Sequence, residues 1–204
     1  MKKIRVIGLF LLISVITILG ACSDNKLRDS LDWDVEKFAF TDQNGKKFAF
    51  TDQNGKKFGS SELKDKVWVA DFIFTSCETV CPPMTANMAK LQKMLNEEGI
   101  KDVEFVSFSV DPEVDTPEKI TEFMKVYEMD KKRTHFLTGY TRPDIEKFAK
   151  DNFQTLVSKP ENNTQVIHGT SFYLVDKDGK VVKKYSGLQN TPYEDIIRDI
   201  KRIR

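Results

Sequence analysis

Two cysteines four positions apart, Cys77 and Cys81, are the residues of this chain with the clearest capacity for chemistry. They follow an apolar run from Val67 to Phe74 and come just before Pro82 and Pro83. The run has the content of a strand buried on both faces, and proline is tolerated in the first turn of a helix. We therefore expect the thiols where a strand turns into a helix. There they would share a helix face beside the positive end of its dipole, which suits redox chemistry or a soft metal.

The segments around the thiols alternate between strand and helix patterns. Short apolar or β-branched runs predict strands at 103–110, 135–138, 170–175 and 181–185, and amphipathic patterns with proline or threonine at their starts predict helices at 82–99, 116–129, 143–152 and from 191 onward. Such an order, built around a strand-to-helix turn that carries thiols, favours an α/β fold. We predict a thioredoxin-like three-layer sandwich with a central mixed sheet and an N-terminal β-hairpin.

The sulfur-containing residues also have structural explanations. Two cysteines in an oxidising compartment most often form a structural disulfide, but a bridge that closes so short a loop gains little chain entropy. Met84 and Met88 could act as soft copper ligands. Together with Leu91 and Leu95 they recur at helical spacing, which indicates packing in the core.

The N-terminus has the organisation of an export signal. Lys2, Lys3 and Arg5 precede an apolar run from Val6 to Leu19, and Gly20-Ala21-Cys22 follows. This segment resembles a bacterial lipoprotein signal of residues 1–21, with Cys22 as the lipidated residue. The alternative is an uncleaved anchor, although the run is shorter than the roughly 20 residues that span a bilayer. We expect a lipid-anchored protein of the cell membrane on its extracytoplasmic face.

Composition limits the remaining possibilities. Without residues 1–21 the chain has 29 basic and 31 acidic residues, a formal charge of −2, and no basic patch stands out. We therefore expect no nucleic-acid partner. The polar residues 22–37 are predicted to tether a single domain, residues 38–204, to the membrane.

A tandem duplication opens the predicted domain. Phe38 to Lys47, FAFTDQNGKK, is repeated without change as Phe48 to Lys57. Each copy contains Asn-Gly between Phe-rich runs, the strongest short signal for a two-residue hairpin turn. Because the second copy has a fixed distance to the central strand, we expect it to hold the register of the domain. The first copy would be extra ribbon or a looped-out segment.

Two histidines are present, and they call for different interpretations. His135 lies in an apolar, strand-like segment and is interpreted as structural. His168 precedes the strand at 170–175, and in thioredoxin-like folds the corresponding loop passes beside the thiols. Two thiolates and an imidazole make a three-ligand set for copper or zinc, open enough for a metal that is handed on. The alternative is a histidine in a surface loop.

Several motifs together resemble the Sco/SenC family of membrane-tethered copper proteins. They are DFIFTSCETVCPPM at 71–84, FVSFSVDPEVDTPE at 105–118, FLTG at 136–139, and His168 before YLVDKDG at 173–179. The resemblance covers about Phe48 to Arg204 and implies one copper ion, Cu(I) or Cu(II), bound by Cys77, Cys81 and His168. It also gives Asp111 a supporting role, although a turn residue that ends a strand before proline is an equally good interpretation. The duplicated hairpin departs from the family pattern.

The resemblance implies a metallochaperone that serves the dinuclear copper centre of cytochrome c oxidase subunit II. Its partners would be subunit II, a copper donor and a thiol reductant, and copper would load only while the thiols are reduced. The competing hypothesis is a thiol–disulfide oxidoreductase that reduces the copper-ligating cysteines of subunit II. In that case Cys77 would attack and Cys81 would resolve, and His168 would be dispensable.

Overall fold

The structure is a computed structural model that describes residues 26–204 except 39, 42–46 and 49. Its centre is a six-stranded mixed sheet in the order β1-β12-β11-β6-β7-β8. Strands β6 (Val67–Ile73), β7 (Val103–Ser109) and β8 (Thr134–Leu137) are parallel, and β11 (Ser171–Val175), β12 (Lys180–Ser186) and β1 (Trp33–Asp34) extend the sheet with antiparallel pairings. The predicted mixed sheet is confirmed.

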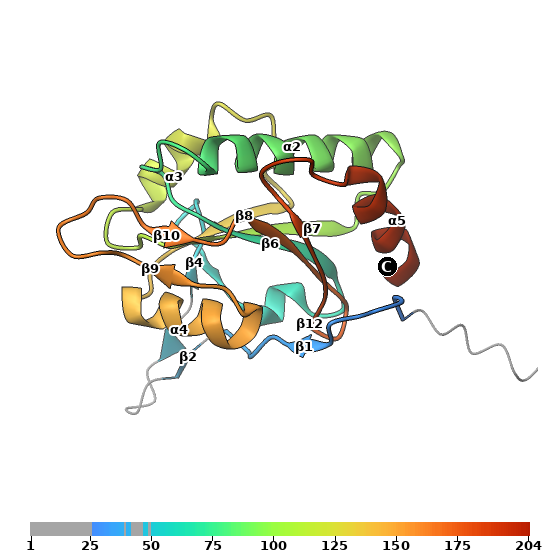
Figure 1. Cartoon of the computed structure of the whole chain (residues 1–204), viewed down its shortest axis with the longest axis horizontal. Helices are drawn as coiled ribbons and strands as arrows, with labels where there is room; N and C mark the ends of the chain where they lie inside the picture. The colour runs from blue at the N-terminus through green and yellow to red at the C-terminus, as the bar shows by residue number, and fades with distance from the viewer. Residues whose placement is uncertain (1–25, 39, 42–46, 49) are drawn as a thin grey trace, which may run out of the picture.

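Helices cover both faces of this sheet (Figure 1). Helix α2 (Cys81–Glu97) runs across one face with α3 (Pro117–Met124) and α5 (Tyr193–Ile203), and α4 (Arg142–Phe153) lies against the other. The 3₁₀ helix η1 (Ser60–Leu63) leads into β6. The result is the three-layer thioredoxin-like sandwich that the alternating pattern predicts.

Local sequence signals account for where these elements begin. Every residue of β6 and β7 is buried, as their near-continuous apolar runs require. Thr116 caps α3 by accepting a hydrogen bond from the Lys119 backbone. Helix α3 ends at Met124 rather than at the predicted Met129. Beyond Met124 the chain continues in turns toward α2, where the Gln92 side chain accepts a hydrogen bond from the Asp130 N–H.

Aromatic rings fill the layer between the sheet and α4. The Phe108 ring of β7 packs 5.4 Å from Phe72 of β6 and 5.2 Å from Phe148 of α4, measured between ring centroids. Phe153, at the end of α4, lies 5.1 Å from Tyr173 of β11. Edge-to-face and offset ring contacts of this kind add to the area burial that holds the layers together.

The second copy of the duplication forms a hairpin that covers the edge of β8. Strands β4 (Phe50–Thr51) and β5 (Lys57–Phe58) pair with each other, and Thr51 exchanges two backbone hydrogen bonds with Thr138. The buried Gln53 side chain donates to the Thr134 carbonyl at 2.8 Å and accepts from the Phe136 N–H at 3.0 Å. The hairpin thus protects an edge strand that would otherwise expose unpaired backbone groups.

The first copy contributes to the core as well, which differs from the expectation that the second copy alone holds the register. Phe38 is buried and stacks on Phe50 with ring centroids 5.2 Å apart, and its N–H donates to the Ser60 hydroxyl. Strands β2 (Phe40–Thr41) and β3 (Lys47–Phe48) pair in the register of the second hairpin, displaced by ten residues. The Asn44-Gly45 turn lies outside the described residues.

The segment predicted as a tether joins the domain earlier than expected. Leu27 is buried, the Leu31 N–H donates to the Val182 carbonyl, and β1 pairs with β12. Residues 27–35 lack the periodicity of a helix or strand, so the sequence pattern alone does not mark them as part of a sheet. The proposed signal peptide and Cys22 lie outside the described residues. Within 26–204, no described helix has the length and hydrophobicity to cross a membrane.

Candidate metal centre

The two thiols lie together at the carboxyl end of β6. Cys77 lies in the loop after the strand and is 7% exposed, and Cys81 is the first residue of α2 and fully buried. Both are free thiols, and the Cys81 N–H points at the Cys77 sulfur, 3.3 Å away. The expectation of a shared helix face is wrong in detail, because Cys77 precedes the helix. A turn, closed by the Cys77 N–H on the Phe74 carbonyl, folds the loop back and brings the sulfurs together.

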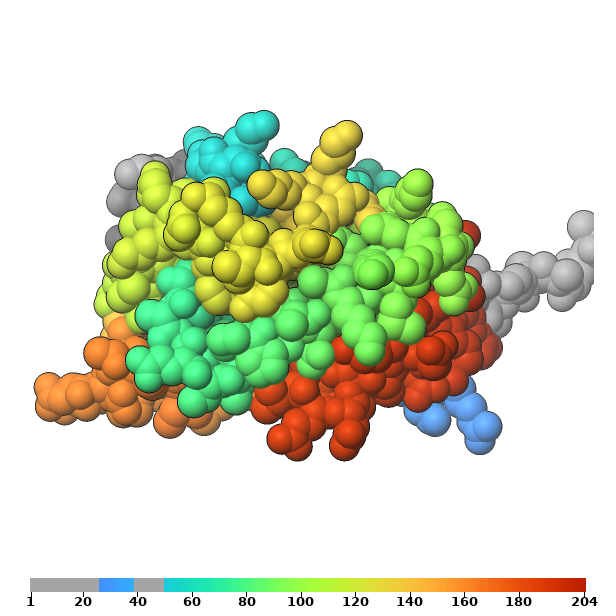
Figure 2. Space-filling model, turned by 90° about the horizontal axis from the view of Figure 1, so that it is seen from above, coloured from blue at the N-terminus to red at the C-terminus, as the bar shows by residue number. Residues whose placement is uncertain are grey.

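His168 completes the group from a distant part of the chain. It lies in β10 (Ile167–His168), which pairs with β9 (Val157–Ser158), so that the two form a short ribbon. The His168 Nε2 atom lies 3.3 Å from the Cys81 sulfur, and the three ligand atoms all lie within 4.8 Å of one another. The loop between β9 and β10 projects from one end of the molecule, beside the start of α2 (Figure 2).

The orientation of the imidazole leaves one nitrogen available to a metal. Its Nδ1 lies 3.0 Å from the Gly169 carbonyl oxygen, which can only accept, so Nδ1 carries the proton. Nε2 faces the sulfurs: when protonated it can donate to the Cys77 thiolate, and when unprotonated it offers its lone pair to a metal. The Phe74 ring packs edge-on against the His168 ring, with the ring centroids 5.7 Å apart, and limits the rotation of the imidazole. A fixed tautomer and a fixed ring plane are what a histidine ligand needs.

The two thiols differ strongly in acidity. Burial alone raises the pKa of Cys77, but interactions with His168, the Cys81 thiol and nearby backbone N–H groups outweigh it and lower the pKa to about 6. Burial and the adjacent Cys77 raise the pKa of Cys81. At neutral pH the site therefore holds one thiolate, Cys77, and one protonated thiol, Cys81.

A buried carboxyl group lies beneath the thiols. Asp71 of β6 is fully buried, and neither of its oxygens has a hydrogen-bond partner among the described residues. Burial raises the pKa of Asp71 to about 7. The negative charge of an ionised Asp71 is in turn one of the causes that raise the pKa of Cys81. In the sequence Asp71 only interrupts an apolar run, and its relation to the site becomes visible once β6 and α2 are in place.

Asp111, given a supporting role by the sequence resemblance, forms its ion pairs with residues outside the thiol loop. Its buried carboxylate binds the Lys159 ammonium at 2.7 Å and lies 3.8 Å from the Arg142 guanidinium. Lys159 directly follows β9. Through this ion pair, Asp111 ties the end of β7 to the ribbon that carries His168, which is one physical route to the predicted supporting role.

Asp115, four residues later, was not singled out by its sequence pattern, yet it contacts the thiol loop directly. Its carboxylate accepts hydrogen bonds from the Thr75 hydroxyl at 2.6 Å and from the Ser109 hydroxyl at 2.6 Å. An aspartate just before a threonine helix cap gives no signal beyond that of a turn residue. Its role depends on the pairing of segments forty residues apart.

The other histidine and the two methionines considered above lie in packed regions of the fold. His135 contacts Glu104 at 3.1 Å and packs on the Phe58 ring at 4.2 Å, which is the structural setting predicted for it. Met84 and Met88 are buried along α2, as core packing requires.

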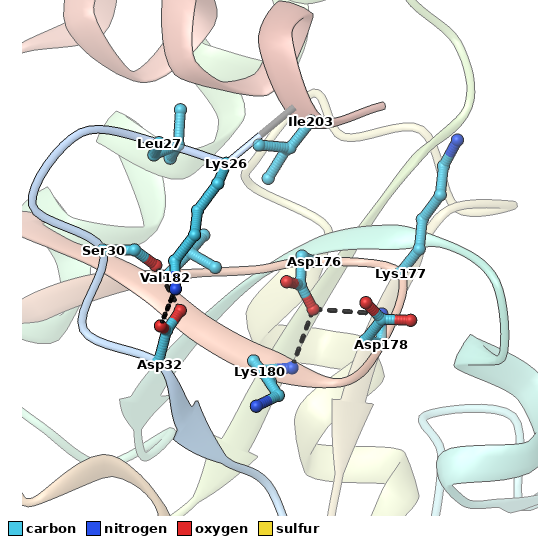
Figure 3. A pocket seen from close by; sticks show the side chains of 10 residues that line it. All are labelled: Lys26, Leu27, Ser30, Asp32, Asp176, Lys177, Asp178, Lys180, Val182 and Ile203. Atoms are coloured by element: carbon cyan, nitrogen blue, oxygen red, sulfur yellow. Dashed lines mark hydrogen bonds and ion pairs between the residues drawn. The ribbon is translucent and has the colours of Figure 1, made fainter. Parts of the chain in front are cut away.

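A hollow of about 510 Å³ lies elsewhere, between the N-terminal segment, the β11–β12 turn and the end of α5 (Figure 3). Its lining mixes charges of both signs, with Lys26 paired to Asp32, and Asp176 accepting from the backbone of Asp178 and Lys180. It includes no cysteine or histidine. This hollow therefore lacks the soft ligands that define the metal centre.

The fold and the site define a class: a thioredoxin-like protein that brings two cysteines and a histidine together in a group suited to a soft metal. The model of the SCO1/SenC family matches residues 36–204. The chain belongs to the SCO1/SenC family.

Three solved structures illustrate the similarity. A SCO1/SenC family lipoprotein from Bacillus anthracis is 61% identical, with a TM-score of 0.79 over 87% of this chain and 98% of that one. BsSco, described as having a disulfide switch and as a member of the Sco family of cytochrome c oxidase assembly proteins, is 49% identical, with a TM-score of 0.76 over 87% and 97%. Bradyrhizobium japonicum ScoI, solved with copper bound, is 26% identical, with a TM-score of 0.63 over 76% and 96%.

Proposed function

We propose that this protein is a copper metallochaperone for the dinuclear copper centre of cytochrome c oxidase subunit II. The observation that carries the proposal is the convergence of Cys77, Cys81 and His168, whose ligand atoms lie within 4.8 Å of one another. Membership of a family that includes a cytochrome c oxidase assembly protein and a copper-bound relative supports both the metal and the task.

The residues present fit copper. Two sulfurs and an imidazole nitrogen suit a soft metal and can hold both Cu(I) and Cu(II), and three protein ligands leave a position open for transfer. Cys77 is already a thiolate at neutral pH, whereas Cys81 must lose its proton to bind. A disulfide between them offers no thiolate, so copper binds only while both are reduced.

The setting we propose is the extracytoplasmic face of the cell membrane. Cleavage after Ala21 would leave Cys22 to carry the lipid, with a few residues between the lipid and the domain. The similarity to a lipoprotein of the same family supports this arrangement. There the protein would receive copper from a donor, be kept reduced by a thiol reductant, and meet subunit II.

A second candidate function is reduction of the copper-ligating cysteines of subunit II, and the unequal acidity of the thiols favours it. The Cys77 thiolate would attack a disulfide of the target, breaking its S–S bond and releasing one target thiolate. Cys81 would then lose its proton and attack the Cys77 sulfur. The products are a Cys77–Cys81 disulfide and a target reduced by two electrons.

Anaerobic copper titration of the reduced full-length chain in detergent separates the two candidates. We expect one equivalent of copper and a thiolate-to-Cu(II) charge-transfer band. His168→Ala removes one of three ligands and should weaken binding more than about tenfold. His135→Ala makes the same change at the chain's other histidine and should leave binding intact.

Two results would argue against the metallochaperone. One is equal copper binding by the parent and His168→Ala, which would remove the imidazole from the site. The other is oxidation of the parent to a disulfide without retained copper. Either result would make thiol–disulfide exchange the better account of the cysteine pair.

A further inference from the structure

The loop that carries Cys77 is held in place at its root by a buried aspartate. Thr75 is the second residue after β6, and it lies two positions before Cys77. The Thr75 hydroxyl donates to Asp115 Oδ1 at 2.6 Å, and the Thr75 N–H lies 3.2 Å and 3.3 Å from the two Asp115 oxygens. The strand ladder has ended at this point, so Asp115 satisfies a backbone donor that the sheet no longer serves.

The direction of each hydrogen bond around Asp115 is determined by its neighbours. Ser109 Oγ accepts from the Asp111 N–H at 3.2 Å and donates its own proton to Asp115 Oδ2 at 2.6 Å. Thr75 contributes an O–H and an N–H, so both carboxylate oxygens face donors only. An amide in place of the carboxylate would bring an NH₂ group against one of these donors.

Asp115 is itself rigidly mounted. It is 1% exposed, its N–H donates to the Asp111 carbonyl at 2.9 Å, and its carbonyl accepts from the Thr138 hydroxyl at 2.8 Å. Thr138 in turn is paired through its backbone with Thr51 of the β4–β5 hairpin. The carboxylate that holds Thr75 is therefore fixed to the turn after β7, to the segment after β8, and through that segment to the hairpin.

Within this frame the positions of the ligand atoms depend on the path of the loop. Cys77 receives the Cys81 N–H at 3.3 Å only because the chain turns back between them. A second contact also holds the loop: the half-buried Gln165 side chain donates to the Ser76 carbonyl at 3.2 Å. The contact at Thr75 is the stronger of the two, because its acceptor is the buried carboxylate of Asp115 whereas the contact at Ser76 joins two neutral groups.

We propose that Asp115 is a positioning residue of the metal and thiol site: by binding Thr75 it sets the loop path that places the Cys77 sulfur against Cys81 and His168. This inference deepens the proposed function and rests on it for the role of copper. The placement of Cys77 itself can be measured without metal.

The test is the rate at which iodoacetamide alkylates Cys77 in the reduced, metal-free full-length chain, followed by peptide mass. Asp115→Asn should slow alkylation about fivefold, because displacement of the loop breaks the hydrogen bond that the Cys81 N–H donates to the Cys77 sulfur at 3.3 Å. The reason is that a displaced loop loses the N–H groups that favour the thiolate. A purely electrostatic role predicts the opposite, because removing a nearby negative charge makes a thiol more acidic.

Variants of Thr75 and a matched control separate positioning from general destabilisation. Thr75→Val removes the hydroxyl but keeps the shape, and should slow alkylation as Asp115→Asn does. Thr75→Ser keeps the hydroxyl and should stay within about twofold of the parent. The control, Asp199→Asn, alters a buried aspartate of α5 that accepts from the Tyr185 hydroxyl at 2.7 Å. It should leave the rate of Cys77 alkylation unchanged.

Copper binding adds an independent outcome. Weaker charge-transfer absorption in Asp115→Asn together with slower alkylation would support the proposal. If the parent itself holds no copper but Asp115→Asn is still alkylated more slowly than the parent, the result would support positioning while refuting the metallochaperone. Unchanged or faster alkylation in Asp115→Asn would overturn the proposal. An equal slowing in Asp199→Asn would overturn it as well.

Discussion

At the level of single residues, the site is built on two thiols with opposite tendencies. Cys77 is stabilised as a thiolate by hydrogen bonds, and Cys81 is kept protonated by burial and by its charged neighbour. Above the pKa of Cys77, metal binding must remove only the Cys81 proton, so in that range the affinity for copper depends on pH through Cys81. The same difference would make Cys77 the attacking thiol in disulfide exchange.

Asp71 provides a residue-level prediction about stability and pH. Burial raises the pKa of Asp71 to about 7, well above the value of about 4 in an unfolded chain. Between these two values the folded state binds more protons than the unfolded state, so stability falls as pH rises through this window and levels off above pH 7. The loss should be about 4 kcal/mol, since each unit of difference is worth about 1.4 kcal/mol.

Asp71→Asn keeps the shape of the side chain and removes the titration. The free energy of unfolding is measured with urea on the reduced, metal-free chains. We expect the difference, variant minus parent, to increase by several kcal/mol from about pH 4 to about pH 8. The comparison with the parent at each pH cancels the contributions of other titrating groups. Parallel curves for the two proteins would show that Asp71 has an ordinary pKa.

At the level of elements, the β9–β10 ribbon decides where His168 points. Gly169 follows His168 and accepts the Nδ1 proton with its carbonyl. A Cβ at Gly169 would lie 2.2 Å from the Thr155 hydroxyl oxygen and 3.5 Å from the Thr155 Cβ. The backbone of the ribbon can therefore approach the segment after α4 only because residue 169 has no side chain.

Gly169→Ala should push the ribbon away from Thr155 and turn His168 out of the site. We expect copper affinity to fall more than about tenfold, as for loss of an orienting contact to a metal ligand. In Gly169→Ala/Thr155→Ala the clashing hydroxyl is gone and the remaining Cβ contact is ordinary, so affinity should return to within about threefold of the parent. Failure of the double variant to recover, while Thr155→Ala alone binds normally, would contradict this explanation.

The elements differ in how far the sequence predicts them. Strands β6 and β7 and helix α2 carry long apolar runs, helical spacing and proline at a helix start, and the structure has them close to the predicted bounds. The ribbon of β9 and β10 has two residues in each strand, too few to show any periodicity. Strand β1 is also two residues long, and for the same reason the sequence pattern predicts a tether there.

The candidate site shows the same division. Cys77 and Cys81 are four residues apart, so their proximity follows from local sequence, whereas the approach of His168 required knowledge of related folds. The contact of Asp115 with Thr75 depends on how the turn after β7 packs against the end of β6. Neither hydrophobic pattern nor motif spacing carries that information, because both describe one segment at a time.

At the scale of the whole molecule, the tandem duplication gives two short paired ribbons, β2–β3 and β4–β5. Phe38 and Phe50 are both 1% exposed and stack at 5.2 Å, so the core receives one ring from each copy. Gln53 and Thr51, both of the second copy, hold the edge of β8. These contacts need one pair of stacked rings and one hairpin, so we expect one ten-residue copy of the repeat to be dispensable to the site.

Removing one copy should leave a working protein. Because the copies are identical, deleting residues 39–48 joins Phe38 to Ala49 and regenerates the sequence Phe-Ala-Phe, the same product as any ten-residue deletion within the repeat. Copper binding and Cys77 alkylation should match the parent. Stability should stay the same or rise by up to about 2 kcal/mol, the closure entropy of a ten-residue loop, which corresponds to a few degrees in Tm.

Deleting both copies, residues 38–57, is the comparison for the single deletion. It removes the two stacked rings and the side chain that completes the β8 edge, and it should lower Tm by far more than the single deletion, because buried phenylalanines contribute about 3–5 kcal/mol each. Thermal unfolding of the three chains, followed by circular dichroism, measures both effects. If the single deletion were as damaging as the double one, the first copy would have to support the fold through more than Phe38, and the hairpins would have to act as one unit.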